Sequence, residues 1–372
     1  MTNTYQHKLG KKLRGVNLGG WLVLEKWMTP SLFENLTARD ETAWCVELAD
    51  QAEPRLKQHW NSFISRDDFA WLASIGINAV RIPVGHWLFA ADYPYHPSYG
   101  SNQHPFVSGR EVILDQAFAW AEQFGLHVVV DLHAAPGCQN GFDNGGIQDV
   151  CEWHSQDQYI DYALKTLERL AQRYGKHPAL HGIEVLNEPR WDIATELLQR
   201  FTLAAYSRIR QHCADDVAVI FHDGFRNFRE YQGFISNNSH RNVIFDIHRY
   251  QCFIGEDVNT DIYGHMRKAA VDWREEANDI ISHSGLATYV GEWSLGLDLK
   301  MAELWRQQSF DYPATDIDEF QLNLAYRGYA AAQLASFEKY LGWFFWSYKT
   351  ETMPQWSFKD CVQRGWLPDR FD

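Results

Sequence analysis

Short apolar runs alternate with amphipathic segments along the whole of this chain. Eight runs are continuously apolar rather than alternating with polar residues, as expected of strands that are covered on both faces. The predicted strands are Gly15–Leu18, Ala79–Val84, His127–Leu132, Gly182–Leu186, Val217–Phe221, Val243–Ile247, Thr288–Val290 and Trp343–Trp346.

The segments between these runs carry helical patterns, and three of them are followed by a glycine in the capping position, at Gly76, Gly125 and Gly175. An α/β fold with a (β/α)8 barrel follows from this alternation. A doubly wound open sheet is the alternative, but no Gly-x-Gly-x-x-Gly motif follows any strand. The predicted helices are Asp67–Ile75, Glu111–Phe124, Gln158–Tyr174, Ala194–Gln211, Met266–His283 and Phe320–Tyr340.

The chain shows no linker, internal repeat or shift in composition, so we predict a single domain over residues 1–372. Long loops are expected at the C-terminal face of the barrel, and two long segments, Met28–Ser65 and Trp87–Ser108, could close one end of that face, although the sequence pattern does not define their conformation. Aromatic residues make up 15% of the chain, and carbohydrate clefts gather such rings. The net charge of −14, without any basic cluster, argues against a nucleic-acid partner.

The N-terminal segment and the spacing of the cysteines favour a cytoplasmic protein. The segment Met1–Lys8 has no apolar core, and no run is long enough to span a bilayer, so no membrane partner is expected. The protein would instead be secreted if this N-terminus results from processing. No Cys-x-x-Cys pair exists, which favours reduced thiols over disulfides or a zinc site. The scattered cysteines are Cys45, Cys138, Cys151, Cys213, Cys252 and Cys361.

Two glutamates carry the strongest chemical signal. Glu188 follows the apolar run Gly182–Leu186 and precedes Pro189, and Glu292 follows the run Thr288–Val290. A buried carboxylate is costly unless it has a partner or a function. Because the carboxyl ends of barrel strands form one active face, the pair suggests acid/base and nucleophile chemistry on a glycosidic bond.

Other polar or aromatic residues stand at nearly every strand end. Each has an ordinary structural interpretation: Arg81 as a buried ion-pair partner, His133 and His248 as structural histidines, Trp346 as a core residue. Their convergence on one face favours a catalytic site over stability alone. The set comprises Asn17, Glu25, Arg81, Asp131, His133, Asn187, His222, Asp223, His248, Tyr250, Trp293 and Trp346.

Seven ordered motifs resemble glycoside hydrolase family 5, and within it the exo-β-1,3-glucanases of fungi. The resemblance covers about Arg14 to Glu351 and implies a retaining (β/α)8 glycosidase that acts from the non-reducing end without a metal or cofactor. The motifs are Arg14–Trp21, Asp131–His133, Gln139–Asn144, Leu186–Pro189, His248-x-Tyr250, Gly291–Trp293 and Trp343–Trp346.

The resemblance implies that Glu188 is the general acid/base and Glu292 the nucleophile. Arg81 and Tyr250 would support the nucleophile, and Asn187 would bind the 2-hydroxyl of the sugar. Retention requires carboxyl groups about 5–5.5 Å apart. At that distance we expect Glu188 to keep a proton while Arg81 keeps Glu292 ionised.

Further sugar contacts are also implied by the resemblance. Trp346 would form the floor under the non-reducing sugar, while Phe142 and Phe253 would clamp the next glucose. Glu25 as a solvated loop carboxylate, and the two phenylalanines as packing residues, are the structural alternatives. The residues implied to bind substrate are Glu25, His133, His248, Trp346, Phe142 and Phe253.

Three positions depart from the family pattern: Ala134, Cys138 and Tyr348 stand where glycine, serine and tryptophan are expected. The expected partner is a β-glucan or β-glucoside oligosaccharide, with the linkage left open and a glycoconjugate as one alternative. A transglycosylase and a non-catalytic carbohydrate-binding barrel are the other candidates. The oligomeric state is left open.

Overall fold

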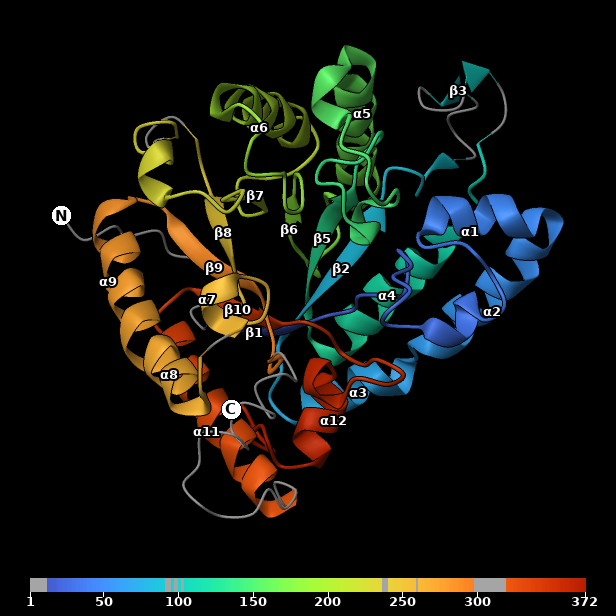
Figure 1. Cartoon of the computed structure of the whole chain (residues 1–372). Coiled ribbons are helices and arrows are strands. Elements are labelled where there is room, and N and C mark those ends of the chain that lie inside the picture. Colours follow the sequence, from blue (N-terminus) through green and yellow to red (C-terminus); the bar gives the residue numbers. More distant parts are fainter. Residues whose placement is uncertain are drawn as a thin grey trace.

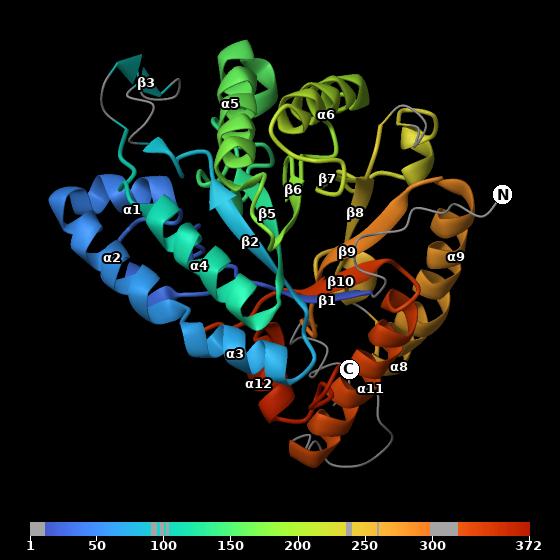
Figure 2. The same cartoon turned by 180° about the vertical axis from the view of Figure 1, so that it is seen from behind.

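Eight parallel strands close into a barrel. The computed structural model describes residues 12–90, 95–96, 100–101, 104–235, 240–258, 260–297 and 319–372. Within these residues the strands follow the order β1-β10-β9-β8-β7-β6-β5-β2, and helices surround them in both views (Figures 1 and 2). The predicted (β/α)8 barrel is confirmed, and the doubly wound sheet is excluded.

The eight strands coincide with the eight predicted apolar runs, with small shifts at their ends. β6 begins and ends two residues earlier than predicted, which leaves Asn187 and Glu188 beyond the strand. All residues of β6 are buried, as expected of a strand that is covered on both faces of the sheet. The barrel strands are β1 (Leu13–Asn17), β2 (Ala79–Gly85), β5 (His127–Ala134), β6 (Leu180–Glu184), β7 (Ala218–His222), β8 (Val243–Arg249), β9 (Ala287–Trp293) and β10 (Gly342–Phe345).

All six predicted helices are present, but one is divided. The region predicted as Met266–His283 consists of the end of α8, a π-helical turn at Lys268–Asp272, and α9. A small hairpin pairs β3 (Tyr95–His96) with β4 (Gly100–Ser101). The α-helices are α1 (Glu41–Leu48), α2 (Ala52–Phe63), α3 (Arg66–Ser74), α4 (Arg110–Phe124), α5 (Asp157–Tyr174), α6 (Thr195–Arg210), α7 (Gly255–Val258), α8 (Ile262–Arg267), α9 (Trp273–His283), α11 (Glu319–Phe337) and α12 (Phe358–Gln363).

Gly175 caps α5 for a different reason from the one predicted. Its φ is −59°, which is right-handed backbone that any residue adopts. A Cβ at this position would instead lie 2.4 Å from the carbonyl oxygen of Ala171 and 2.7 Å from Sγ of Cys213. Close approach of neighbouring atoms, rather than a left-handed turn, is what requires glycine here.

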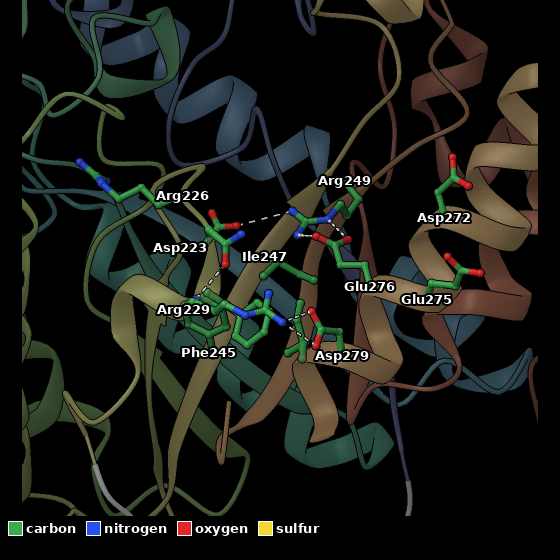
Figure 3. Close-up of a pocket in the computed structure, with 13 residues that line it drawn as sticks. Asp223, Arg226, Arg229, Phe245, Ile247, Arg249, Asp272, Glu275, Glu276 and Asp279 are labelled. Atoms are coloured by element: carbon green, nitrogen blue, oxygen red, sulfur yellow. Dashed lines mark hydrogen bonds and ion pairs between the residues drawn. The ribbon is translucent and has the colours of Figure 1, made fainter. Parts of the chain in front are cut away.

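In the part that the structure describes, the connection from β7 to β8 contains a short 3-10 helix at Phe228–Tyr231. A cavity of about 440 Å³ lies beside this turn, between β8 and α9 (Figure 3). Charged pairs bridge its walls: Arg229 with Asp279 at 2.7 Å and Arg249 with Glu276 at 2.7 Å. Within each pair the positive and negative charges neutralise each other, on the outer side of the barrel.

The six cysteines are free thiols. Among the described residues, no helix combines the length and the apolar character that a bilayer crossing needs.

Candidate active site

Arg81 on β2 lies at the centre of a charged cluster inside the barrel. Its side chain is 1% exposed, and an unpaired guanidinium there would be very costly. Its guanidinium donates four hydrogen bonds and forms an additional ion pair with Asp131, so five oxygen atoms surround it. The acceptors are Glu184 Oε2 at 2.7 Å, Asn187 Oδ1 at 2.8 Å, Asn17 Oδ1 at 2.9 Å, Glu292 Oε1 at 2.9 Å and Asp131 Oδ2 at 3.1 Å.

Glu292 lies on β9 with donors on both of its carboxylate oxygens. Oε1 accepts a hydrogen bond from Arg81 at 2.9 Å, and Oε2 accepts one from the hydroxyl of Tyr250 at 2.8 Å. Both bonds favour the ionised carboxylate. Burial raises the pKa of Glu292, against the opposing positive charges of His248 and Arg81.

Glu188 lies just beyond the end of β6 in a left-handed backbone conformation, with φ of 43°. Such a conformation costs a non-glycine residue about 1–3 kcal/mol and is concentrated at functional sites. Its Oε1 accepts a hydrogen bond from Nδ1 of His248 at 2.8 Å, and its Oε2 accepts one from Nδ2 of Asn144 at 3.1 Å. The side chain is therefore held from two sides.

His248 on β8 joins the two glutamates. Its Nδ1 lies 2.8 Å from Glu188 Oε1 and 3.4 Å from Glu292 Oε2. The sum of these distances is an upper limit on the separation of the two oxygen atoms. The structure thus brings together the two carboxylates that the sequence singled out.

The distribution of protons differs from the sequence-based expectation that Glu188 holds a proton. Burial raises the pKa of Glu188, but the hydrogen bond and charge of His248 outweigh burial and lower this pKa below its ordinary value. Burial lowers the pKa of His248, but the carboxylates of Glu292 and Asp246 hold it well above its ordinary value. The two shifts favour an ionised Glu188 carboxylate beside a positively charged His248 ring.

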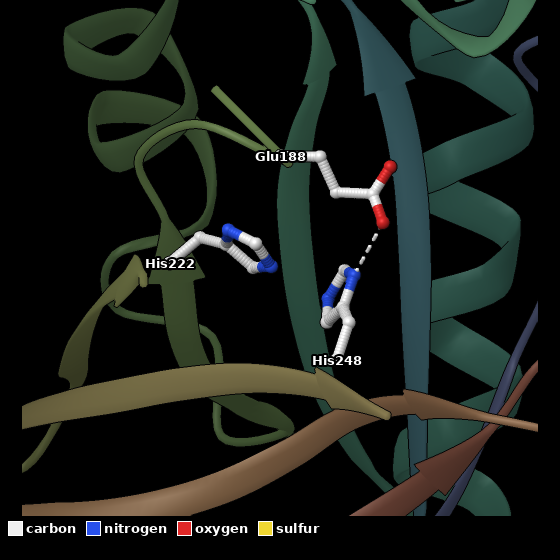
Figure 4. A group of neighbouring side chains, drawn as sticks. All are labelled: Glu188, His222 and His248. Carbon is white, nitrogen blue, oxygen red and sulfur yellow. Dashed lines mark hydrogen bonds and ion pairs between the residues drawn. The ribbon is translucent and has the colours of Figure 1, made fainter. Parts of the chain in front are cut away.

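His222, at the end of β7, lies against the same cluster. Figure 4 shows its ring directed toward the space beside Glu188 and His248. The backbone N–H of Gly224 donates to His222 Nδ1 at 2.8 Å, so the proton of the neutral ring is on Nε2. Burial and the charge of His248 hold the pKa of His222 well below its ordinary value. Its Nε2 is buried without a hydrogen-bond partner among the described residues.

The ligand atoms of Glu188, His222 and His248 lie within 4.8 Å of one another, a spacing that a transition metal would accept. A metal-bound imidazole uses the lone pair of one nitrogen and donates a proton from the other. In His222 the nitrogen directed at the cluster carries the proton, while the other accepts from Gly224. This pattern fits a hydrogen-bond donor better than a metal ligand.

Two predicted sugar contacts offer free donors or acceptors beside the glutamates. Asn187 binds Arg81 through Oδ1, and its Nδ2 is buried without a described partner. His133 pairs Nδ1 with Asp131 at 2.6 Å, and its Nε2 is likewise buried without a described partner. Trp346 stacks on the His133 ring with centroids 5.2 Å apart. These atoms are available to sugar hydroxyl groups.

Glu25 is only 3% exposed, so its interpretation as a solvated loop carboxylate is wrong. Oε2 accepts a hydrogen bond from Nε1 of Trp27 at 2.9 Å, and Oε1 is buried without a described partner. Burial, together with the nearby Asp143, raises the pKa of Glu25 well above its ordinary value. The side chain fits a hydroxyl binder in a recessed pocket.

The two predicted clamp residues are the exposed members of the set. Phe142 is 37% exposed and Phe253 is 72% exposed. The Phe253 ring lies 5.5 Å from the ring of Tyr250, which itself contacts Glu292. Trp293, also collected at a strand end, packs instead against Phe345 in the core and is not a site residue.

Three functional neighbours were missed as individual candidates. Asn144 donates to Glu188, Glu184 accepts from Arg81, and Asp246 approaches His248 Nε2 at 3.4 Å. The available signal was a charged residue inside an apolar run, since Glu184 and Asp246 both interrupt predicted strands. Asn144 is the last residue of the Gln139–Asn144 motif, but no role had been assigned to it and its contact with Glu188 was not predicted.

The fold and this arrangement define a barrel hydrolase with a glutamate pair. Residues 48–351 match the family described as Cellulase (glycosyl hydrolase family 5). The chain belongs to glycosyl hydrolase family 5 and is a glycoside hydrolase.

Relatives of known name cover nearly the whole chain. The chain is 34% identical over 394 residues to a glucan 1,3-beta-glucosidase of Blumeria graminis, covering 97% of this chain and 88% of that protein. It is 36% identical over 391 residues to a probable glucan 1,3-beta-glucosidase of Arthroderma benhamiae, covering 97% and 90%.

Solved structures share the fold at low sequence identity. The rutinosidase from Aspergillus niger has a TM-score of 0.77 and 20% identity, covering 96% of this chain and 98% of that chain. Cel5A of Thermotoga maritima, in a structure with cellobiose, has a TM-score of 0.56 and 15% identity, covering 95% and 97%.

Proposed function

We propose that this protein is a retaining exo-β-1,3-glucanase that releases glucose from the non-reducing end of β-1,3-linked oligoglucosides. The observation that carries the proposal is the position of His248 Nδ1, 2.8 Å from Glu188 and 3.4 Å from Glu292. The sum of these distances is an upper limit on the separation of Glu188 Oε1 and Glu292 Oε2, and it lies below the ~6.5–9.5 Å typical of the carboxyl groups of inverting enzymes. The pair fits direct attack by one carboxylate.

In the first step Glu292 attacks the anomeric carbon while Glu188 protonates the leaving oxygen, giving a glycosyl-enzyme. Water then attacks the same carbon, and Glu188 takes its proton. Arg81 and Tyr250 donate to the carboxylate of Glu292 and favour the ionised form that attacks, in opposition to burial, which raises its pKa. Asn187 Nδ2 is free to bind the 2-hydroxyl, a contact that strengthens in the transition state.

The substrate class is supported by the named relatives and by recessed polar atoms. Glu25 Oε1 and His133 Nε2 are buried and unpaired among the described residues, as sites that bind sugar hydroxyl groups require. Exposed Phe142 and Phe253 offer apolar faces to a second sugar. These features fit a short oligosaccharide with its terminal glucose buried.

The test is a panel of aryl β-glycosides and β-1,3-, β-1,4- and β-1,6-linked glucose oligosaccharides. We expect Glu292→Ala to lower kcat by about 10⁴-fold or more, and Glu188→Ala to lower it by about 10²–10⁴-fold on disaccharides. The exposed Glu53→Gln on α2 serves as control and retains the wild-type rate. Full rates in both catalytic variants would refute the mechanism.

Product analysis tests specificity. Release of β-glucose as the first product, with the β-1,3 linkage cleaved fastest, supports the proposal. Preference for another linkage would refute the β-1,3 assignment alone. Longer products at high substrate concentration would show that a sugar, rather than water, resolves the glycosyl-enzyme.

A further inference from the structure

We propose that the catalytic proton is held by a buried relay of Asp246, His248 and Glu188, in which Asp246 is a positioning residue for His248. The proposal rests on the proposed function, because it takes Glu188 as the group that protonates the leaving oxygen. Beyond that function, the proposal assigns a positioning role to Asp246 and names His248 as the group that holds the proton between catalytic cycles.

The geometry places a carboxylate near each nitrogen of one ring. His248 Nδ1 is hydrogen-bonded to Glu188 Oε1 at 2.8 Å. His248 Nε2 lies 3.4 Å from Asp246 Oδ2, an ion-pair distance, and makes no hydrogen bond among the described residues. Asp246 is 1% exposed, and its Oδ1 accepts the backbone N–H of Gly291 at 2.6 Å. An imidazole between two carboxylates is stabilised in its doubly protonated form.

Gly291 supplies independent support, because its lack of a side chain makes the space that Asp246 occupies. A Cβ on Gly291 would lie 2.0 Å from Asp246 Oδ2 and 2.3 Å from Oδ1. Any other residue would push the Asp246 carboxylate from its position beside His248. The glycine before Glu292 is thereby explained by the relay rather than by backbone conformation.

The other charged and titratable groups that face His248 come from four strands, and they affect how readily its ring takes up a proton. Glu292 from β9 adds negative charge at 3.4 Å from His248 Nδ1. Glu184 from β6 also lies beside His248, but burial raises its pKa well above the ordinary value and so disfavours its charged form. His222 from β7 contacts the His248 ring at 4.2 Å and stays neutral, because Gly224 occupies its Nδ1. Arg81 from β2 directs its donors at other oxygens. The carboxylates around His248 favour its positively charged form, whereas His222 stays neutral.

The proposed step moves one proton without changing the overall reaction. As Glu292 bonds to the anomeric carbon and the bond to the leaving oxygen breaks, Glu188 gives that oxygen a proton. His248 Nδ1 supplies the proton to Glu188. In the second step the attacking water bonds to the anomeric carbon, the bond to Glu292 breaks, and the proton of the water returns through Glu188 to His248.

Asp246→Asn tests the relay, since the amide keeps the size of the side chain and an acceptor for Gly291. Removing the negative charge lowers the pKa of His248, so the Glu188–His248 unit loses its proton at lower pH. We expect the basic limb of the kcat/KM–pH profile to move down by about 1–3 pH units. An unchanged basic limb in the folded variant would overturn the proposal.

Asp68→Asn is the matched control, because it removes a buried carboxylate on α3 that pairs with Lys359 and makes no contact with His248 among the interactions of the described residues. It should leave the profile in place. If Asp246→Asn does not fold, histidine-selective ¹⁵N NMR of the wild-type enzyme decides. We expect both ring nitrogens of His248 to be protonated at pH 7, with the signal assigned by its loss in His248→Gln. A neutral His248 would refute the relay.

A comparison of leaving groups separates this proposal from the proposed function. A dinitrophenyl β-glucoside needs no protonation, so Glu188→Ala should form the glycosyl-enzyme on it at close to the wild-type rate while losing activity on disaccharides. Equal losses on both substrates would remove Glu188 as the acid, and with it the proposed function. A normal Glu188→Ala pattern with an unshifted Asp246→Asn profile would remove the relay alone.

Discussion

The hydroxyl of Tyr250 donates a hydrogen bond of 2.8 Å to Oε2 of Glu292. Tyr250→Phe removes a donor to a charged acceptor, which is worth about 1.5–3 kcal/mol, so kcat/KM should fall by about 10- to 150-fold. Because the lost bond favours the ionised carboxylate, the pKa of Glu292 rises and the acid limb of the pH profile moves upward. Steady-state kinetics across pH measure both effects.

Tyr329→Phe on α11 is the control for that substitution. Its hydroxyl is buried without a hydrogen-bond partner among the described residues, so its removal should leave kcat/KM unchanged. An acid limb that stays in place in Tyr250→Phe would contradict the assigned contact.

Arg81→Lys should destabilise the protein, because a lysine offers three donors to the five oxygen atoms around Arg81. Leaving buried carboxylates without a partner costs about 3–5 kcal/mol, measurable as a lower free energy of unfolding in urea. Arg229→Lys is the matched control: its pair with Asp279 is half exposed and should change stability by about 0–1 kcal/mol. Equal effects of the two substitutions would contradict the central role of Arg81.

Asn144→Asp should move the basic limb of the kcat/KM profile in the opposite direction from Asp246→Asn. The amide of Asn144 lies 3.1 Å from Glu188 Oε2, and a carboxylate there repels the ionised form of Glu188. The pKa of Glu188 therefore rises, and the enzyme keeps its acid proton to higher pH, by about one unit or more. The exposed Asn227→Asp adds the same charge elsewhere and should leave the limb unchanged.

His59 on α2 should set part of the acid sensitivity of the fold. Its Nε2 lies 2.8 Å from the carbonyl oxygen of Gly20, and burial lowers the pKa of His59 to about 4. In the unfolded chain the group titrates near its ordinary value, so stability is complete above about pH 6.5 and is lost as pH falls toward 4. The loss from this group reaches about 3 kcal/mol.

Urea unfolding between pH 4 and 7 measures that loss. His59→Gln keeps a donor for Gly20 and should flatten the dependence, whereas the exposed His283→Gln should retain it. An identical pH dependence in wild type and His59→Gln would refute the assignment.

The sequence was sufficient for the barrel and for the glutamate pair. The eight strands were predicted within a few residues because a buried strand is a continuous local run of apolar side chains. Glu188 and Glu292 stood out because each placed a charge at the end of such a run. The resemblance to family 5 then supplied roles for Arg81, Tyr250 and Asn187, and the structure places all three beside the pair.

The tertiary structure alone decided which carboxylates surround His248 and in which direction the pKa values of Glu188 and His248 shift. Asp246 and Gly291 are separated by 45 residues, yet one fills the space that the other leaves. Glu188 and His248, 60 residues apart, are joined by a hydrogen bond of 2.8 Å that the sequence did not indicate. A run of apolar side chains is a local property of the chain. A pKa depends instead on burial and on charges that only the closed barrel brings together.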